Sequence, residues 1–397
     1  MISDIHPDLR TLESVVGRAT CFVMLAATLV ACESKPLLPP PPPNGDDDRI
    51  VWHIADYPGR GTPGHHGDLV YFAARDHNVV AVECESGEVA WSTKLPVALP
   101  SYYGTGLVVT GGAVVVGDQD VFGLDLLSGQ ILWRFAPSGV LNPGLILPAA
   151  AGPNVIITSS SGHLFSVVAA TGAINWVTQI LGDDDLRIFT PIVRDGDVFI
   201  SFTQGVISQL QRGGVARIAL QDGAVRWWKY LPPPSDTNRS SLTLEPALAG
   251  DVLAAASRDG PTFGFRVSDG ALAWTLPTAP ELLTGPGAPF QELAPLASNG
   301  TLIFVGSSQG RIRAVDPATG NVVWERLPGY GGTGWLAADS THLAAIFPLG
   351  DMQLISAGDG KLDVHVSKES ITARMTPLMT KDRVYFSGER GLYAIRR

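Results

Sequence analysis

A glycine followed four residues later by a tryptophan recurs along most of this chain. The six copies are Gly87/Trp91, Gly129/Trp133, Gly172/Trp176, Gly223/Trp227, Gly270/Trp274 and Gly320/Trp324. Successive tryptophans lie 42, 43, 51, 47 and 50 residues apart. A seventh copy, Gly360/Val364, keeps the spacing and has valine in place of tryptophan. A local motif repeated at such a period indicates a repeat architecture built from one small supersecondary unit.

The copy that ends at Trp324 shows what one unit contains. Its short extended runs are 293–297, 302–305, 311–315 and 321–324. Tight turns separate them, and Gly310 and Gly320 supply the backbone freedom that such turns need. Four short strands in about 40 to 50 residues are the content of one propeller blade. The repeated tryptophan is expected to pack between neighbouring blades, which is a structural role.

Counting the strand-like segments predicts eight blades. Segments typical of a third strand occur near Ala81, Phe122, Val167, Arg217, Phe265, Ala314, Leu354 and Leu392. Segments typical of a fourth strand occur near Trp52, Trp91, Trp133, Trp176, Trp227, Trp274, Trp324 and Val364. The chain thus begins with a fourth strand and ends with a third. We expect residues 49–54 to pair with residues 392–397, because this closure leaves no open sheet edge at the seam.

The sequence therefore predicts an all-β fold, an eight-bladed propeller of four-stranded blades that forms one domain over residues 49–397. The preceding 48 residues have a different character. Residues 21–31 (CFVMLAATLVA) form an uncharged apolar run that is too short to span a bilayer and follows Arg18. This is the pattern of a signal-peptide core, and we expect a signal peptide over residues 1–31. A buried core helix is the alternative.

The residues that follow the apolar run predict a lipid anchor and a tether. Leu29-Val30-Ala31-Cys32 resembles a bacterial lipobox, in which the cysteine becomes the lipidated first residue of the mature chain. Cys32 is therefore the expected lipidation site. Residues 32–48 contain a run of five prolines, and such a run is extended and stiff. This segment is expected to hold the propeller away from a membrane.

The charge disfavours nucleic acid as a partner, and the sequence contains no local catalytic motif. The net charge of −10 disfavours nucleic acid, whose binding needs a basic surface. No phosphate loop, nucleophile elbow or zinc-helix motif occurs in the sequence. His65-His66 and Asp183-Asp184-Asp185 are the candidate metal ligands, and an ordinary surface loop is the competing interpretation of each. We therefore predict no catalytic, cofactor-binding or metal-binding residue.

Two insertions depart from the short turns of the repeat. They are residues 204–214 and residues 277–290. Loops of this length on a rigid scaffold are frequent binding elements, although neutral surface elaboration is the alternative.

The segments AVDPATGNVVW, ending at Trp324, and VAATGAINW, ending at Trp176, resemble the quinoprotein-type propeller repeat, whose pattern is A-x-D-x-x-T-G-x-x-x-W. The resemblance covers residues 49–397 and leaves two branches open. One is the quinone-dependent dehydrogenases, whose alcohol-oxidising members carry a vicinal cysteine pair that this chain lacks. The other is the non-enzymatic BamB-like lipoproteins of the outer-membrane barrel-assembly machinery. A repeat lipoprotein with a different protein partner is a third possibility.

The BamB-like resemblance implies a scaffold without a cofactor, anchored in the bacterial envelope at the outer membrane and facing the periplasm. In that family a Leu-x-Leu-Arg loop before a mid-ring blade contacts the barrel-assembly partner. Here Asp184-Asp185-Leu186-Arg187 occupies the comparable place, so Leu186 and Arg187 match and Asp184 replaces the first leucine. Leu186 and Arg187 are therefore the residues expected to bind the partner.

Overall fold

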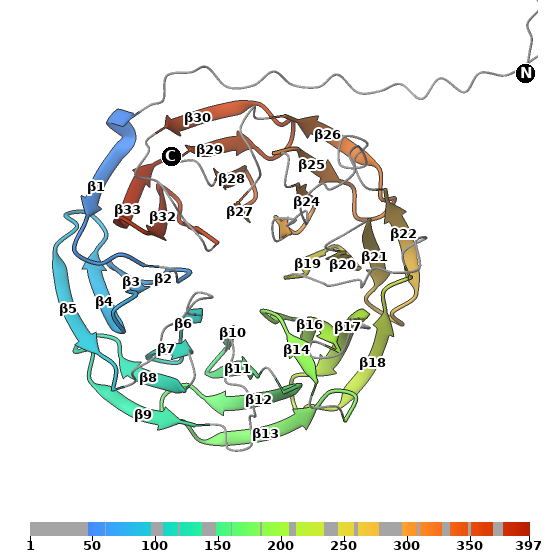
Figure 1. The fold of residues 1–397 in the computed structure, drawn as a ribbon, viewed down its shortest axis with the longest axis horizontal. Helices are drawn as coiled ribbons and strands as arrows, with labels where there is room; N and C mark the ends of the chain where they lie inside the picture. The colour runs from blue at the N-terminus through green and yellow to red at the C-terminus, as the bar shows by residue number, and fades with distance from the viewer. Residues whose placement is uncertain are drawn as a thin grey trace, which may run out of the picture. The chain divides into compact units, whose positions relative to one another are not determined.

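Eight β-sheets stand around a ring in the computed structural model of this chain (Figure 1). The structure describes residues 47–59, 61–96, 106–117, 120–136, 148–159, 161–182, 185–205, 212–233, 245–257, 261–277, 296–307, 310–327, 334–347, 351–367 and 376–397. The chain divides into residues 1–35 and 36–397, and all described residues belong to the second unit. The sheets confirm the predicted all-β, eight-bladed propeller.

Each blade is an antiparallel meander that runs from the centre of the ring to its rim. The innermost strands are β2 (Gly64–His66), β6 (Gly106–Thr110), β10 (Pro148–Ala151), β14 (Leu186–Ile188), β15 (Ile192–Arg194), β19 (Ala247–Ala249), β23 (Ala297–Ser298), β27 (Trp335–Ala338) and β31 (Leu378–Met379). The second strands are β3 (Leu69–Ala73), β7 (Ala113–Gly117), β11 (Asn154–Thr158), β16 (Asp197–Gln204), β20 (Val252–Ala256), β24 (Ile303–Gly306), β28 (His342–Phe347) and β32 (Arg383–Gly388).

The outer half of each blade contains the segments that the sequence singled out. The third strands are β4 (Asn78–Glu83), β8 (Val121–Asp125), β12 (His163–Val168), β17 (Arg212–Ala219), β21 (Thr262–Arg266), β25 (Ile312–Val315), β29 (Asp351–Ser356) and β33 (Gly391–Arg396). The rim strands are β5 (Val89–Lys94), β9 (Ile131–Phe135), β13 (Ile174–Gln179), β18 (Val225–Tyr230), β22 (Leu272–Leu276), β26 (Val322–Arg326), β30 (Leu362–Ser367) and β1 (Ile50–Ile54). Among the described residues the one helical element is a 3-10 turn, η1 (Asp47–Arg49). None of the described helices is long and apolar enough to cross a membrane.

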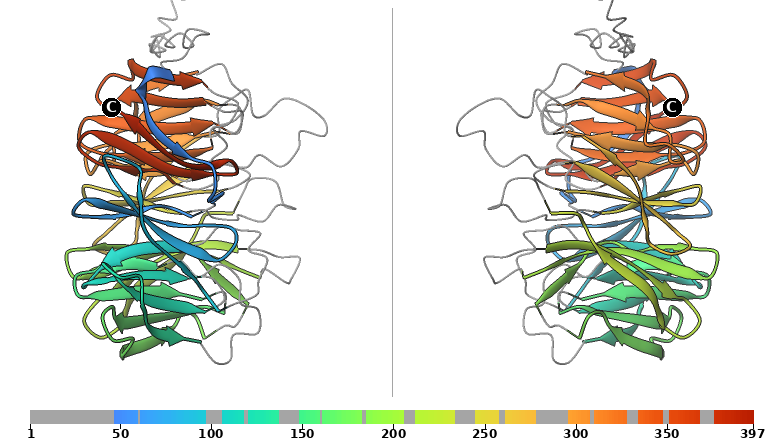
Figure 2. Two further views of the ribbon diagram at one scale, coloured as in Figure 1. Left: turned by 90° about the vertical axis from the view of Figure 1, so that its left-hand side faces the viewer. Right: turned by 90° about the vertical axis from the view of Figure 1, so that its right-hand side faces the viewer.

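Both ends of the chain contribute to the last blade, as predicted. Strand β1 pairs with β33 in antiparallel fashion, with Ile50 opposite Ile395 and Ile54 opposite Leu392. Viewed from the edge of the ring, β1 lies against the C-terminal strands (Figure 2). Arg383 of β32 extends this closure to the first blade by bonding the carbonyl of Cys84 and the carboxylate of Glu85.

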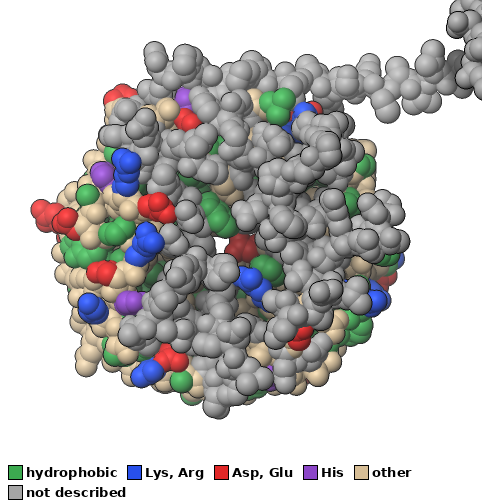
Figure 3. Space-filling model, in the orientation of Figure 1, with side chains coloured by type: hydrophobic (Ala, Val, Ile, Leu, Met, Phe, Trp, Pro, Cys, Tyr) green, Lys and Arg blue, Asp and Glu red, His purple; other side chains and the backbone are tan. Residues whose placement is uncertain are grey.

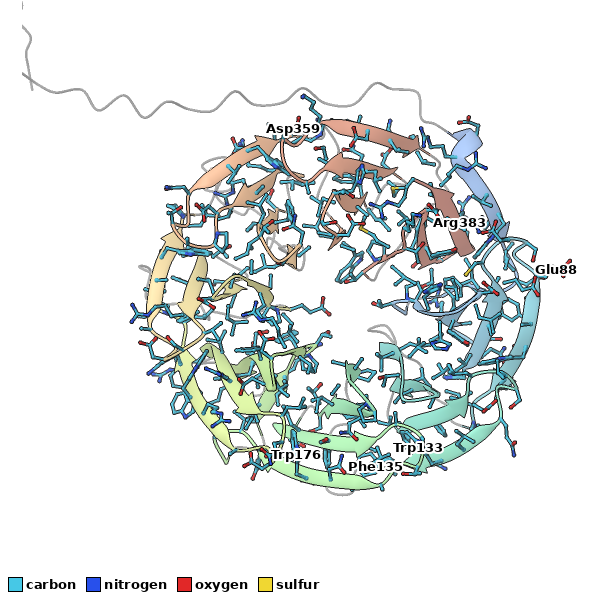
Figure 4. The ribbon with its side chains drawn as sticks, turned by 180° about the vertical axis from the view of Figure 1, so that it is seen from behind. Glu88, Trp133, Phe135, Trp176, Asp359 and Arg383 are labelled. Atoms are coloured by element: carbon cyan, nitrogen blue, oxygen red, sulfur yellow. The ribbon has the colours of Figure 1, made fainter. Side chains whose placement is uncertain are left out.

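The tryptophans join each blade to the next. The indole N–H of each donates to the carbonyl that follows the third strand of the following blade, at 2.7–3.0 Å. The pairs are Trp52/Cys84, Trp91/Leu126, Trp133/Ala169, Trp176/Leu220, Trp227/Val267, Trp274/Pro317 and Trp324/Ala357. Figure 4 labels Trp133 and Trp176 at the same place in two successive blades. These bonds satisfy a buried or half-buried polar group and fix the angle between blades.

The glycine of each of the six glycine–tryptophan copies packs on the tryptophan of the preceding blade, not on its own. Gly172 has φ of +73°, and a Cβ placed on it would lie 2.8 Å from the ring of Trp133. Gly129 lies in the same way against Trp91, and Gly320 against Trp274. The repeated spacing is therefore an interlock between neighbouring blades. Eight apolar clusters fill the interfaces, each with side chains from two adjacent blades.

The interface between the seventh and eighth blades lacks this tryptophan, because Val364 occupies its position. Arg397, the residue after β33 in blade 8, contacts blade 7 with its side chain instead. Its guanidinium lies 2.5 Å from the Asp339 carboxylate and donates to the Thr341 hydroxyl at 3.2 Å and to Nδ1 of His342 at 2.9 Å. The carbonyl of Arg397 accepts from Arg49 at 2.9 Å. An ionic contact thus replaces the aromatic one at this junction.

Candidate partner-binding surface on blade 4

The fourth blade departs from the repeat in its strands. Strands β16 and β17 are eight residues long, whereas the second and third strands of the other blades have four to six. The added length of β16 lets two short inner strands pair with it one after the other, β14 with its end and β15 with its beginning. Phe189 continues the contact by donating its N–H to the Ser201 carbonyl at 3.1 Å, and Pro191 then separates the two short strands.

The insertion expected at residues 204–214 is in part strand. Gln204 ends β16, and Arg212 begins β17 directly opposite it, so the insertion lengthens a hairpin. Residues 206–211 lie outside the described residues. The prediction of a long loop was therefore wrong for Gln204 and for residues 212–214, at the two ends of this segment. These residues are in strands, because β16 and β17 continue to pair with each other there. Most of the second insertion, residues 278–290, lies outside the described residues.

Leu186 and Arg187 lie in β14, a strand, where the sequence suggested a loop. Leu186 is opposite Gln204 and is fully buried in the apolar cluster between blades 3 and 4, with Ile188 beside it in the same cluster. Arg187 points to the other face of the strand, is half-buried and places its guanidinium 5.3 Å from the centre of the Phe189 ring. Of the two residues, Arg187 alone presents side-chain surface to a partner in this arrangement.

A carboxyl group fixes the inner end of this blade to the next. The Thr190 hydroxyl donates to Oε1 of Glu245 at 2.6 Å. Burial raises the pKa of the Glu245 carboxyl, and the hydroxyl donor opposes that rise. The bond links the segment between β14 and β15 to the entrance of blade 5, and so it restrains the strand that carries Arg187.

The structure describes three of the candidate metal ligands, His65, His66 and Asp185. His65 and His66 are adjacent exposed residues of β2, opposite Val70 and Leu69, so their side chains point to opposite faces of the sheet. Asp183 and Asp184 lie outside the described residues, and Asp185 precedes β14 with its carbonyl bonded to the N–H of Gly205. Within the described ranges, no three histidine, cysteine, aspartate or glutamate side chains come close enough to hold a metal ion.

Acidic and basic side chains are interspersed on the described part of the face in Figure 3. The sequence patterns did not point to Trp228 and Tyr230 on the rim strand of blade 4, or to Arg212 on its third strand. The doubled tryptophan at Trp227-Trp228 was the available signal, because one of two adjacent strand residues must face away from the blade junction that the other fills.

Comparison with known proteins assigns the family. A family model described as outer membrane protein assembly factor BamB matches residues 44–217 and 208–397, which together cover the whole ring. The chain belongs to this family. The BamB-like chain is 24% identical over 264 residues to the protein named outer membrane protein assembly factor BamB from Burkholderia pseudomallei. That alignment covers 65% of this chain and 63% of the relative, so it spans less than two thirds of either.

Other relatives extend the likeness over more of the chain. The protein of the same name from Shewanella oneidensis is 22% identical over 361 residues, which are 86% of this chain and 85% of that protein. A polyvinylalcohol dehydrogenase from a Pseudomonas species is 21% identical over 348 residues, covering 69% of this chain and 54% of that protein. Among solved structures, the computationally designed Ika8 protein aligns with a TM-score of 0.65 at 12% identity, covering 88% of this chain and all of that chain, which supports the fold alone.

Proposed function

We propose that this chain is a non-enzymatic, membrane-anchored scaffold that binds a protein of the outer-membrane barrel-assembly machinery. The observation that carries the proposal is the match of the BamB family model to both halves of the propeller. The geometry is consistent with a scaffold, because interlocked blades hold the exposed side chains of the described strands in defined positions. Rigid presentation lowers the entropic cost of binding.

Arg187 is the proposed contact residue on this scaffold. It lies on a short strand whose other face is anchored by Leu186 and Ile188 in the core and whose end is tied to Glu245 through Thr190. A guanidinium held over an aromatic ring keeps its positive charge, and that charge attracts a carboxylate. Leu186 supports this position from inside the blade, which explains the Leu-Arg pair in structural terms.

The test is retention of the barrel-assembly protein by the full-length, membrane-bound protein. Arg187→Ala is expected to reduce recovery of the barrel protein at least tenfold, whereas Arg194→Ala, in β15 of the same sheet, is the matched control and keeps it. A change of Leu186 would confuse the result, since removing a fully buried leucine costs about 2–5 kcal/mol of stability. Equal recovery with Arg187→Ala would place the contact elsewhere, and no recovery with the unchanged protein would reject the proposal.

The similarity to polyvinylalcohol dehydrogenase supplies the second candidate, a quinone-dependent oxidoreductase. The same purified protein distinguishes the two. Adding pyrroloquinoline quinone and calcium is expected to give no dye-linked oxidation of alcohols, polyvinyl alcohol or sugars. Saturable oxidation that follows the cofactor titration would favour the dehydrogenase.

A further inference from the structure

The junction of blades 7 and 8 differs in chemistry from the other seven. In those seven an indole N–H donates to the carbonyl of the residue after the next third strand, as Trp324 does to Ala357 at 2.8 Å. At the eighth junction Val364 has no donor, and the equivalent carbonyl, that of Arg397, accepts from the Arg49 guanidinium at 2.9 Å. An indole and a carbonyl keep the same charge at every ordinary pH, whereas the side chains that replace them here include groups that titrate.

A histidine lies among these side chains. Nδ1 of His342 is 2.9 Å from Nη2 of Arg397, and Nε2 of His342 is 3.2 Å from a carboxylate oxygen of Asp363. The Thr341 hydroxyl oxygen is 2.8 Å from the same Nδ1 and 2.9 Å from the Asp339 carboxylate. We call these five residues, Asp339, Thr341, His342, Asp363 and Arg397, the blade 7/8 contact.

The partners of His342 determine which of its nitrogens carries the proton. A guanidinium only donates, so Nδ1 must be unprotonated to accept from Arg397. A carboxylate only accepts, so Nε2 carries the hydrogen and donates it to Asp363. The Thr341 hydroxyl can give its one hydrogen to the Asp339 carboxylate. The blade 7/8 contact therefore requires a neutral imidazole with its proton on Nε2.

A second proton on His342 is incompatible with this arrangement. It would turn Nδ1 from an acceptor into a donor and place an imidazolium against the Arg397 guanidinium, whose side chain is largely buried and so weakly screened by solvent. The new Nδ1–H has an alternative acceptor in the Thr341 oxygen, and Asp363 accepts from Nε2–H in both charge states. The imidazolium thus keeps its place, and the guanidinium is the group displaced.

Two carboxylates of blade 7 favour the charged imidazole and so set the direction of the change. Asp363 on β30 bonds His342 directly, and Asp339 lies on the turn before β28. Burial would raise the pKa of Asp339, but bonds from Arg397, His342 and Thr341 lower it below its usual value. Asp339 therefore stays ionised when His342 titrates, and it continues to hold the guanidinium after the bond to Nδ1 is lost.

The remaining charged groups around the contact act less directly. Lys361, just before β30, interacts with Asp363 and with Asp359. Arg49 of η1 reaches the contact through the carbonyl of Arg397. The turn of blade 8 that accepts the Arg397 N–H carries Lys381 and Asp382, one charge of each sign, both exposed. On β29 the residue opposite His342 is Ser356, which is uncharged.

We propose that the blade 7/8 contact is a pH-sensitive device in which protonation of His342, between about pH 8 and pH 5, displaces the Arg397 guanidinium from Nδ1 and loosens blade 8 against blade 7. The loosening is local, because the tryptophan bonds of the other seven junctions do not titrate. It affects the blade that β1 and β33 close together. The inference does not depend on the identity of the partner.

The test is hydrogen–deuterium exchange of the full-length protein at about pH 7.5 and about pH 5.5, with rates corrected for the intrinsic effect of pH. Residues 391–397, which form β33 and its last contact, are expected to exchange about tenfold faster at the lower pH, the effect of losing one charge-assisted hydrogen bond. Residues 121–126, the equivalent segment of blade 2, are the internal reference, because their junction has the Trp91 bond.

Two variants assign the change to one histidine. His342→Gln keeps an acceptor for Arg397 and a donor for Asp363 but does not titrate, so its exchange is expected to be the same at both pH values. His53→Gln is the matched control on β1 of blade 8. One ring nitrogen of His53 bonds the Arg390 carbonyl at 2.8 Å, and this bond needs an N–H in either charge state, so the control should keep the acid effect.

Each outcome decides. Equal corrected exchange of residues 391–397 at both pH values in the unchanged protein would reject the device, and so would an acid effect that persists in His342→Gln. Equal acceleration of residues 121–126 would show a general loosening and overturn the assignment to one junction. Should His342→Gln exchange rapidly already at about pH 7.5, the nitrogen chemical shifts of His342 in the unchanged protein decide. A proton on Nδ1 at that pH would overturn the proposal, and an unprotonated Nδ1 that gains its proton as residues 391–397 loosen would support it.

Discussion

At the scale of single residues, the repeated glycine and tryptophan form contacts between blades. Gly172 shows that two separate requirements exclude a side chain at this position. Its φ of +73° lies in the left-handed region, and a side chain there would overlap the Trp133 ring. The sequence shows the spacing of Gly172 and Trp176, yet the ring that Gly172 touches belongs to a residue 39 positions earlier, Trp133. No local pattern distinguishes these two partners, because both are tryptophans of the same repeat.

Gly172→Ala separates the two requirements when it is compared with Gly152→Ala. Gly152 has φ of +64° and open space where a Cβ would stand, so its substitution is expected to cost only the backbone strain, about 1–2 kcal/mol. Gly172→Ala adds the overlap with Trp133 and is expected to cost about 2 kcal/mol more. Urea denaturation of the two variants measures the difference. Equal losses would mean that the Trp133 ring moves aside freely.

At the scale of elements, strand β14 and the junction of blades 7 and 8 show what the sequence reveals and what it conceals. Strand number, blade number and closure follow from turn glycines and alternating runs, which are local, and all three were confirmed. The strand character of Leu186 and Arg187 depends on Phe202, Thr203 and Gln204, which extend β16 to meet them. A pairing set by partners 14 to 18 positions away leaves no mark in the segment itself, so the loop prediction failed there.

The replacement of tryptophan at Val364 makes the junction of blades 7 and 8 sensitive to acid. Burial would raise the pKa of Asp339, but the Arg397 guanidinium and the N–H groups of His342 and Thr341 outweigh it and lower the pKa below its usual value. A carboxyl whose pKa is lowered on folding stabilises the fold above its unfolded pKa of about 4, and this contribution disappears as the pH falls below that value.

Arg397→Gln is therefore expected to destabilise the protein by about 1–2 kcal/mol at pH 7, since its side chain is 9% exposed and the Asp339 side chain is 33% exposed. The loss should shrink as the pH falls below about 4, where Asp339 becomes protonated in the variant and then in the unchanged protein. Urea denaturation across this pH range measures it. Arg396→Gln is the matched control, because Arg396 is the exposed neighbour on β33. A loss that is constant with pH would show that the ion pair does not contribute.

At the scale of the whole molecule, the propeller is a closed ring, and its first strand along the chain, β1, is a rim strand that follows the N-terminal segment.

We predict that Cys32 is the lipidated first residue of the mature protein. Cys32→Ala is expected to move the protein from the membrane fraction to the soluble fraction, and mass spectrometry of the unchanged mature protein should find the lipid on Cys32. Cys84→Ala, which changes the other cysteine of the mature chain, should stay with the membrane. A Cys32→Ala protein that remains fully membrane-bound would contradict the anchor.

The meeting of the two ends in one blade has a consequence for the order of the chain. Ile50 lies opposite Ile395, and the Arg49 side chain reaches the carbonyl of Arg397, so the termini of the ring are already neighbours. A short linker between them would give a chain without a fixed starting point. The turns between a third strand and a rim strand carry the interlocking glycines, so the turns between an innermost strand and a second strand are the sites at which the backbone can be opened. Circular permutants opened at these turns keep the seven tryptophan contacts between blades, and their differing stabilities would rank the blades by how much each contributes to closing the ring.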